Sequence, residues 1–77
     1  MAIGIIKSKE AIGDVIVATV SCEHGETKQI FACLTSMLSC WEYDNLDMCK
    51  VGDEIEFLSS CVDSEYGEEL NYLGVMK

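Results

Sequence analysis

The stretch that decides the fold is Asp14–Cys22, which reads DVIVATVSC. Its β-branched residues would occupy both faces of an extended chain, which is typical of a strand that is covered on two sides. Glu23–Glu26 follows and contains a glycine, the residue that supplies the positive φ of a tight reversal. Thr27–Leu34 is therefore predicted to return as the next strand of a hairpin.

Three further strands are predicted outside this hairpin, in the ranges Ala2–Ser8, Glu54–Cys61 and Leu70–Met76. The first is short, apolar and β-branched, and in the second Ile55 and Phe57 alternate with residues of the opposite face. Polar or glycine-containing turns are predicted between the strands, at Lys9–Gly13, Lys50–Asp53 and Asp63–Glu69.

The pattern changes between Thr35 and Lys50, where apolar residues recur near helical spacing at Met37, Leu38, Trp41, Met48 and Cys49. Ser39 followed three residues later by Glu42 resembles a capping box, so a short helix or helical turn is predicted here. This order of elements within 77 residues predicts one domain, residues 1–77. It is typical of a mainly β, five-stranded Greek-key barrel of the OB type, with a short helix between strands three and four.

The cysteines are odd in number, evenly scattered and free of any Cys-x-x-Cys pair: Cys22, Cys33, Cys40, Cys49 and Cys61. This spacing favours free, mostly buried thiols over a disulfide framework or a zinc site. No run approaches the roughly 20 apolar residues of a membrane-spanning helix, and the N-terminus shows no basic leader. We therefore expect a cytoplasmic protein that contacts no membrane and carries no cofactor.

Charge is the strongest compositional feature, with a formal net of −9 and no arginine. Residues 1–38 hold three lysines and four acids, whereas residues 39–77 hold two lysines and ten acids. Proteins bind a phosphate backbone by neutralising it with lysine and arginine, so direct nucleic-acid binding is not expected. A basic protein surface is the partner that this charge favours.

The predicted strands resemble a cold-shock domain over nearly the whole chain. The matching segments are Gly4–Lys7, Gly13–Val17, Ile30–Met37, Val51–Phe57 and the last strand. The resemblance implies single-strand binding through a Lys-Gly-Phe-Gly-Phe motif and a Val-Phe-Val-His-Phe motif. This chain departs from both, because Ile12–Ile16 reads IGDVI and Ile30–Leu34 reads IFACL, which keeps only Phe31. Base stacking on aromatic rings is the core of such binding, so the family's function is expected to be lost or replaced.

No catalytic or metal site is predicted. His24 is the only histidine and lies in the expected hairpin loop, two residues after Cys22, with no further sign of a nucleophilic pair. The acids around Asn45 and those of the last loop lack the glycine and the ligand spacing of an EF-hand.

Two candidate partner-binding surfaces remain. The first is acidic and comprises Glu42, Asp44, Asp47, Asp53, Glu54, Glu56, Asp63, Glu65, Glu68 and Glu69. The second is an apolar face at the position where a cold-shock domain carries the aromatic rings that stack on bases. It is formed by Ile16, Phe31, Cys33 and Leu34. The alternatives are a solubilising coat for the acids and, if the strand register is shifted by one, core positions for the apolar residues.

The preferred hypothesis is a non-enzymatic inhibitor or nucleic-acid mimic that occupies the basic surface of a partner such as a nucleic-acid-binding enzyme. Viral or mobile-element proteins of the anti-restriction or anti-CRISPR type are similar in size and charge. One alternative is a divergent cold-shock-like chaperone that binds single strands through Phe31, Trp41 and the lysines. Others are a subunit of a larger assembly, such as a viral particle, and a homodimer joined through the apolar face.

Overall fold

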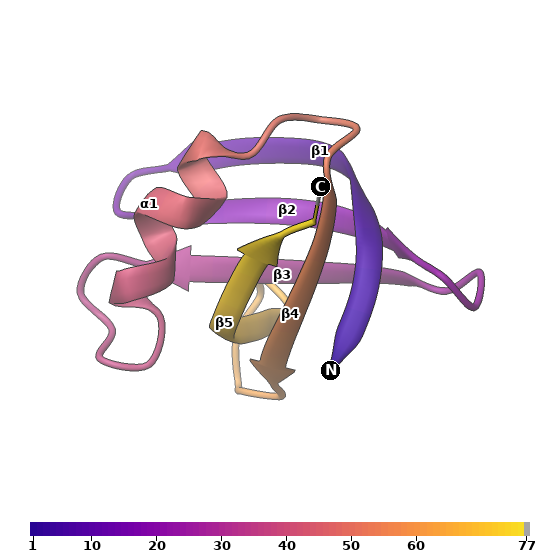
Figure 1. The fold of residues 1–77 in the computed structure, drawn as a ribbon. Helices are drawn as coiled ribbons and strands as arrows, with labels where there is room; N and C mark the ends of the chain where they lie inside the picture. The colour runs from indigo at the N-terminus through magenta and orange to yellow at the C-terminus, as the bar shows by residue number, and fades with distance from the viewer. Residues whose placement is uncertain (77) are drawn as a thin grey trace.

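The computed structural model describes residues 1–76, which form a closed barrel of five strands with one helix. The elements are β1 (Ala2–Ile12), β2 (Val15–Cys22), β3 (Thr27–Cys33), α1 (Cys40–Met48), β4 (Glu54–Ser60) and β5 (Glu68–Val75). Around the barrel the strands follow the order β1-β2-β3-β5-β4, and β4 pairs again with β1 (Figure 1). The predicted fold class is confirmed, and this arrangement is compatible with an OB-like fold.

β1 is the longest strand because it pairs with two neighbouring strands, β2 and β4. Its first residues, Ala2–Ile5, pair with β4, and the strand pairs with β2 from Gly4 to Ile12. An irregularity between Ile6 and Ser8 bends the strand between these two partners. The predicted turn at Lys9–Gly13 is therefore wrong, since its first four residues belong to the ladder with β2. The turn between β1 and β2 consists of two residues, Gly13, with φ of 60°, and Asp14.

The other four predicted strands are confirmed, with ends that differ by one or two residues. Neighbouring strands are antiparallel except for β3 and β5, which run parallel over Ile30↔Glu68 and Phe31↔Glu69. This short pairing closes the barrel. It also moves the start of β5 to Glu68, two residues before the predicted start.

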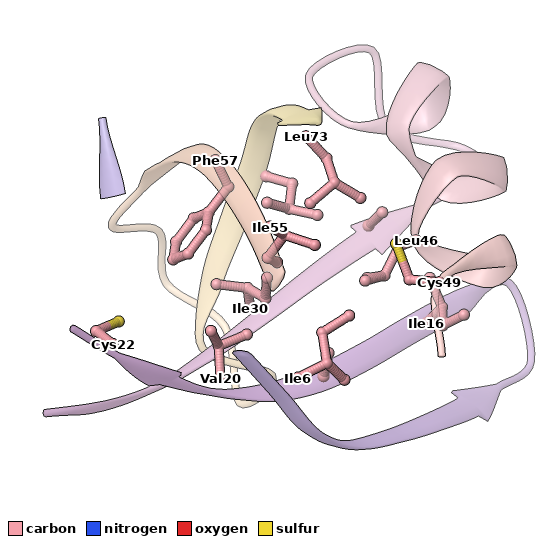
Figure 2. Close-up of a cluster of buried hydrophobic side chains, with 13 residues drawn as sticks. Ile6, Ile16, Val20, Cys22, Ile30, Leu46, Cys49, Ile55, Phe57 and Leu73 are labelled. Atoms are coloured by element: carbon pink, nitrogen blue, oxygen red, sulfur yellow. The ribbon is translucent and has the colours of Figure 1, made fainter. Parts of the chain in front are cut away.

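The core combines inward-facing residues of all five strands with two side chains from the end of the helix. The main buried apolar residues are Ile6, Ile16, Val20, Ile30, Ile55, Phe57, Leu70 and Leu73. Figure 2 shows Leu46 and Cys49 beside Ile16, at the end of the core away from Cys22. α1 therefore plugs one end of the barrel, whereas the β2–β3 hairpin extends from the other (Figure 1).

The start of α1 is held by the barrel rather than by the predicted capping box. Ser39 is the N-cap residue, but it makes no side-chain cap bond. Its hydroxyl accepts a hydrogen bond from the Cys33 N–H at 3.0 Å, and the Glu42 carboxylate accepts one from the Leu73 N–H at 3.0 Å. The capping box is wrong because both side chains have partners on strands, which tie the helix to β3 and β5.

The other end of α1 is held by Lys9, whose side chain leaves β1 on the barrel's inner side. The Lys9 ammonium donates to the carbonyl of Asp47 at 2.6 Å and to the carbonyl of Cys49. A cation at a helix C-terminus also interacts favourably with the helix dipole.

In residues 1–76 no helix is long and apolar enough to cross a membrane.

Replacement of Lys9 by methionine should therefore loosen the helix from the barrel. Lys9→Met preserves side-chain length but removes both bonds to helix carbonyls, so we expect a loss of about 1–2 kcal/mol in unfolding free energy. Urea denaturation with an unchanged m-value measures this loss. Lys7→Met, at an exposed position of the same strand, is the control and should be near neutral. Equal losses in the two variants would contradict the role assigned to Lys9.

Candidate functional site

Five acids of the predicted acidic surface are exposed and come from three parts of the fold. Asp44 and Asp47 lie on α1, Glu54 begins β4, and Asp63 and Glu65 lie in the loop before β5. Among residues 1–76 the structure contains one ion pair, between Lys28 and Glu68 at 3.6 Å. None of the five exposed acids takes part in this pair.

Three other acids of the predicted surface are engaged within the fold. Glu42 binds Leu73 as described and also accepts from the Asn45 amide at 3.0 Å. Asp53 accepts from the Lys50 N–H at 2.8 Å and so shapes the turn before β4. The Ser59 hydroxyl donates to Glu68 at 2.7 Å, and this bond, together with the Lys28 ammonium, lowers the pKa of Glu68 although burial opposes the shift. Glu56, half-buried on β4, adds less to the surface than the exposed acids.

Glu69 is the clearest departure from the predicted surface, because its side chain is only 6% exposed. Its Oε2 accepts hydrogen bonds from the Ser39 hydroxyl at 2.6 Å and from the Ser36 hydroxyl. Ser39 is fully buried and, in turn, accepts from the Cys33 N–H. Glu69 is therefore buried rather than part of an exposed acidic surface, and its carboxylate joins β5 to the segment that enters α1.

The predicted apolar face is divided between the two sides of the barrel wall. Ile16 pairs with Ala32 and Phe31 pairs with Val17, so Ile16 and Phe31 point in opposite directions. Ile16 is 1% exposed and belongs to the core, which corrects its assignment to the face. The alternative of a register shifted by one therefore holds for β2. Cys33 is half-buried, and only Leu34 is exposed.

Phe31 lies on the outer side of the barrel but is covered by the loop before β5. Tyr66 packs on it with a ring-centroid distance of 5.9 Å and an interplanar angle of 58°. The next residue, Gly67, has φ of 98°, and a Cβ there would overlap the carbonyl of Gln29. The glycine lets the loop cross β3 closely enough to bury the ring to 7% exposure. Phe31 is therefore not free for base stacking in this conformation.

Lysines are also absent from the part of the barrel wall around Phe31. Glu10 lies opposite Val17, which lies opposite Phe31, so an acid stands two strands away from Phe31 on the same side of the wall. Lys9 is bound to the end of α1, and Lys28 is paired with Glu68. Lys7 is exposed on β1, but the Phe31 ring is covered, so the outer side of β1–β3 lacks the free aromatic ring that single-strand binding requires.

The most exposed apolar surface was not predicted as a site. It consists of Met37, Leu38, Trp41 and Met48, which we name the tryptophan ridge. The spacing of these residues predicts a helix, but they do not form its buried side. The buried side chain of α1 is Leu46. The available signal was the seven-residue separation of Trp41 and Met48, which places both on one helix face, opposite Leu46.

The open end of the barrel holds a pocket of about 350 Å³ whose wall includes Cys22, His24, Glu26 and Lys28. Burial and the neighbouring Glu26 carboxylate raise the pKa of the Cys22 thiol, which disfavours the thiolate that a nucleophile needs. His24 is exposed in the hairpin loop. Within residues 1–76 no three metal-binding side chains of the His, Cys, Asp and Glu types lie close enough to hold an ion.

Comparison with protein-family models, with curated proteins and with solved structures gave no match for this chain.

Loss of the Ser39 hydroxyl should destabilise the junction of β3, β5 and α1. Ser39→Ala leaves the Cys33 N–H and the Glu69 carboxylate each with one partner fewer in a buried site, so we expect a loss of about 1–3 kcal/mol. The unfolding free energy in urea is the measurement. Ser8→Ala, at an exposed position on β1, is the matched control. A Ser39 variant as stable as this control would show that the junction does not depend on the hydroxyl.

Thiol reactivity should follow burial. All five cysteines are free, with Cys22 and Cys49 buried and Cys61 exposed. Burial raises the pKa of both the Cys22 and the Cys49 thiol, so these two should react with a disulfide reagent last and Cys61 first. Timed labelling of the native protein, with Cys61→Ser to identify the fast phase, measures this order. Fewer than five reactive thiols in denaturant without reductant would contradict the free-thiol assignment.

Proposed function

We propose that this chain is a non-enzymatic protein-binding module that occupies the basic, nucleic-acid-binding surface of a partner protein. The observation that carries the proposal is the set of five exposed acids, Asp44, Asp47, Glu54, Asp63 and Glu65, which lack ion-pair partners within the described residues. The module would act as an inhibitor or nucleic-acid mimic in the cytoplasm, where free cysteines persist. An anti-restriction or anti-CRISPR protein of viral or mobile-element origin is the type that fits this size and charge.

The physical basis is the likeness between a carboxylate and a phosphate as acceptors for lysine and arginine. Both form charge-assisted hydrogen bonds with these side chains, and arginine can bind either group in a bidentate manner. The net charge of −9 adds a long-range attraction that speeds encounter with a positive surface. Since no lysine within residues 1–76 forms an ion pair with the exposed acids, a partner need not break such pairs there to bind them.

The second candidate function is a divergent cold-shock-like protein that binds single strands. The OB-like strand order favours this function. The covered Phe31 ring and the acid beside Val17 count against it, because they remove stacking and charge from the side of the barrel that such binding would use.

Direct nucleic-acid binding separates the two functions. We expect no binding of a fluorescent oligo(dT) or single-stranded RNA at physiological salt, measured by anisotropy, because the chain carries excess negative charge and no arginine. Micromolar or tighter binding would contradict the proposed function and favour the cold-shock-like alternative.

Displacement of DNA from basic enzymes tests the proposal itself. In a panel of purified restriction and CRISPR nucleases, we expect the chain to displace labelled DNA from at least one enzyme, with an affinity that falls as salt rises. Asp44→Lys with Asp47→Lys should slow association more than it speeds dissociation. Glu23→Lys with Glu26→Lys makes the same change of charge in the β2–β3 hairpin and is the control. Equal effects of the two variants would mean that only net charge matters.

A further inference from the structure

The four side chains of the tryptophan ridge are mostly exposed to solvent and do not contribute to the core. Met37 is 92% exposed, Trp41 82%, Met48 78% and Leu38 59%. Single exposed apolar residues are common, but several of them within twelve residues, among them a nearly bare tryptophan, are a feature of interaction sites. Trp41 is also the chain's only tryptophan, and tryptophan is enriched among the residues that dominate binding energy.

Trp41 and Met48 of the ridge lie on the side of α1 that the barrel does not use, and Met37 and Leu38 belong to the segment just before the helix. Leu46 faces the core, Tyr43 packs partly against it, and Cys49 follows at the helix end. Trp41 and Met48 lie two helical turns apart on the opposite face, about 10 Å from each other along the axis. The helix therefore carries apolar side chains on both sides, and within residues 1–76 the barrel covers only the side of Leu46.

Charge around the ridge restricts what can cover it. Asp44 and Asp47 are exposed between Trp41 and Met48, and no lysine, arginine or histidine occurs from Gln29 to Cys49. A second copy joined by a two-fold axis would bring these acids against their own counterparts, with only Lys9, which is bound to the end of α1, and Lys50 nearby in the described residues to offset them. Nucleic acid and anionic membranes would be repelled for the same reason. The remaining occupant is a protein with a positive surface.

We propose that the tryptophan ridge docks into an apolar groove bordered by lysine or arginine on the partner, with Trp41 as the anchor and Asp44 and Asp47 pairing with the border. This inference rests on the proposed function, because it assumes a basic partner. It adds that the contact is centred on α1 and that burial of Trp41, rather than charge alone, sets the dissociation rate.

Two synthetic peptides serve as probes of defined chemistry. One is an amphipathic helix of leucine and lysine, which offers an apolar stripe with a basic border. The other is a lysine and serine peptide of equal charge, which offers no apolar stripe. The full chain should bind the first more tightly, with a blue shift of the Trp41 emission as the indole leaves water. Salt should weaken binding of both peptides.

Variants then locate the contact. Trp41→Ala should weaken binding of the leucine–lysine helix by about 30-fold, the loss typical of a hot-spot residue, and should abolish the preference for this helix over the lysine–serine peptide. Leu58→Ala is the matched control, because Leu58 is an exposed apolar residue beside the pocket at the other end of the barrel. Both variants should match the parent chain in urea denaturation.

The outcomes separate the two proposals. If both peptides bind equally and Trp41→Ala has no effect, the ridge is not the anchor, although the acidic module stands. If neither peptide binds, or a leucine–glutamate helix binds as well as the leucine–lysine helix, both proposals fail. Dimerisation of the free chain that Trp41→Ala abolishes, measured by sedimentation, would overturn the ridge as a site for a different protein.

Discussion

Closure of the barrel depends on two residue pairs where β3 and β5 run parallel, and the Glu69 carboxylate secures this point from the side. Backbone pairing there is short, so the bonds from Ser36 and Ser39 to Glu69 add a second link between the same segments. Because Ser36 and Ser39 precede α1, the link that closes the barrel also places the helix over its end. The position of α1, and with it that of Trp41, Asp44 and Asp47, follows from this junction.

Much of the barrel could be predicted because strands and turns have strong local signals. The β-branched run of β2 and the glycine of the following loop determine a hairpin whatever surrounds them. The length of β1 could not be predicted in the same way. Lys9 and Glu10 have the polarity of a turn, and they are held in a strand by pairing with Ala18 and Val17, which no local pattern shows.

The candidate surfaces were harder to predict, since each depends on contacts between distant residues. An acid such as Asp44 is exposed on the helix, whereas Glu69 is buried by serines about 30 residues away in sequence. The sequence shows a surplus of acids but not which of them the fold uses. Ile16 and Phe31 were assigned to one face, and a register that differs by one residue places them on opposite sides of the barrel wall.

The two sides of α1 have separate tasks. Leu46, Glu42 and the carbonyls that Lys9 binds connect the helix to the barrel, whereas Trp41, Asp44 and Met48 point away from all of them. Changes on the outer side therefore need not disturb folding. The outer side of such a helix can change in sequence while the barrel keeps its fold. In the laboratory, its outer positions can be randomised to select new specificities on an unchanged scaffold.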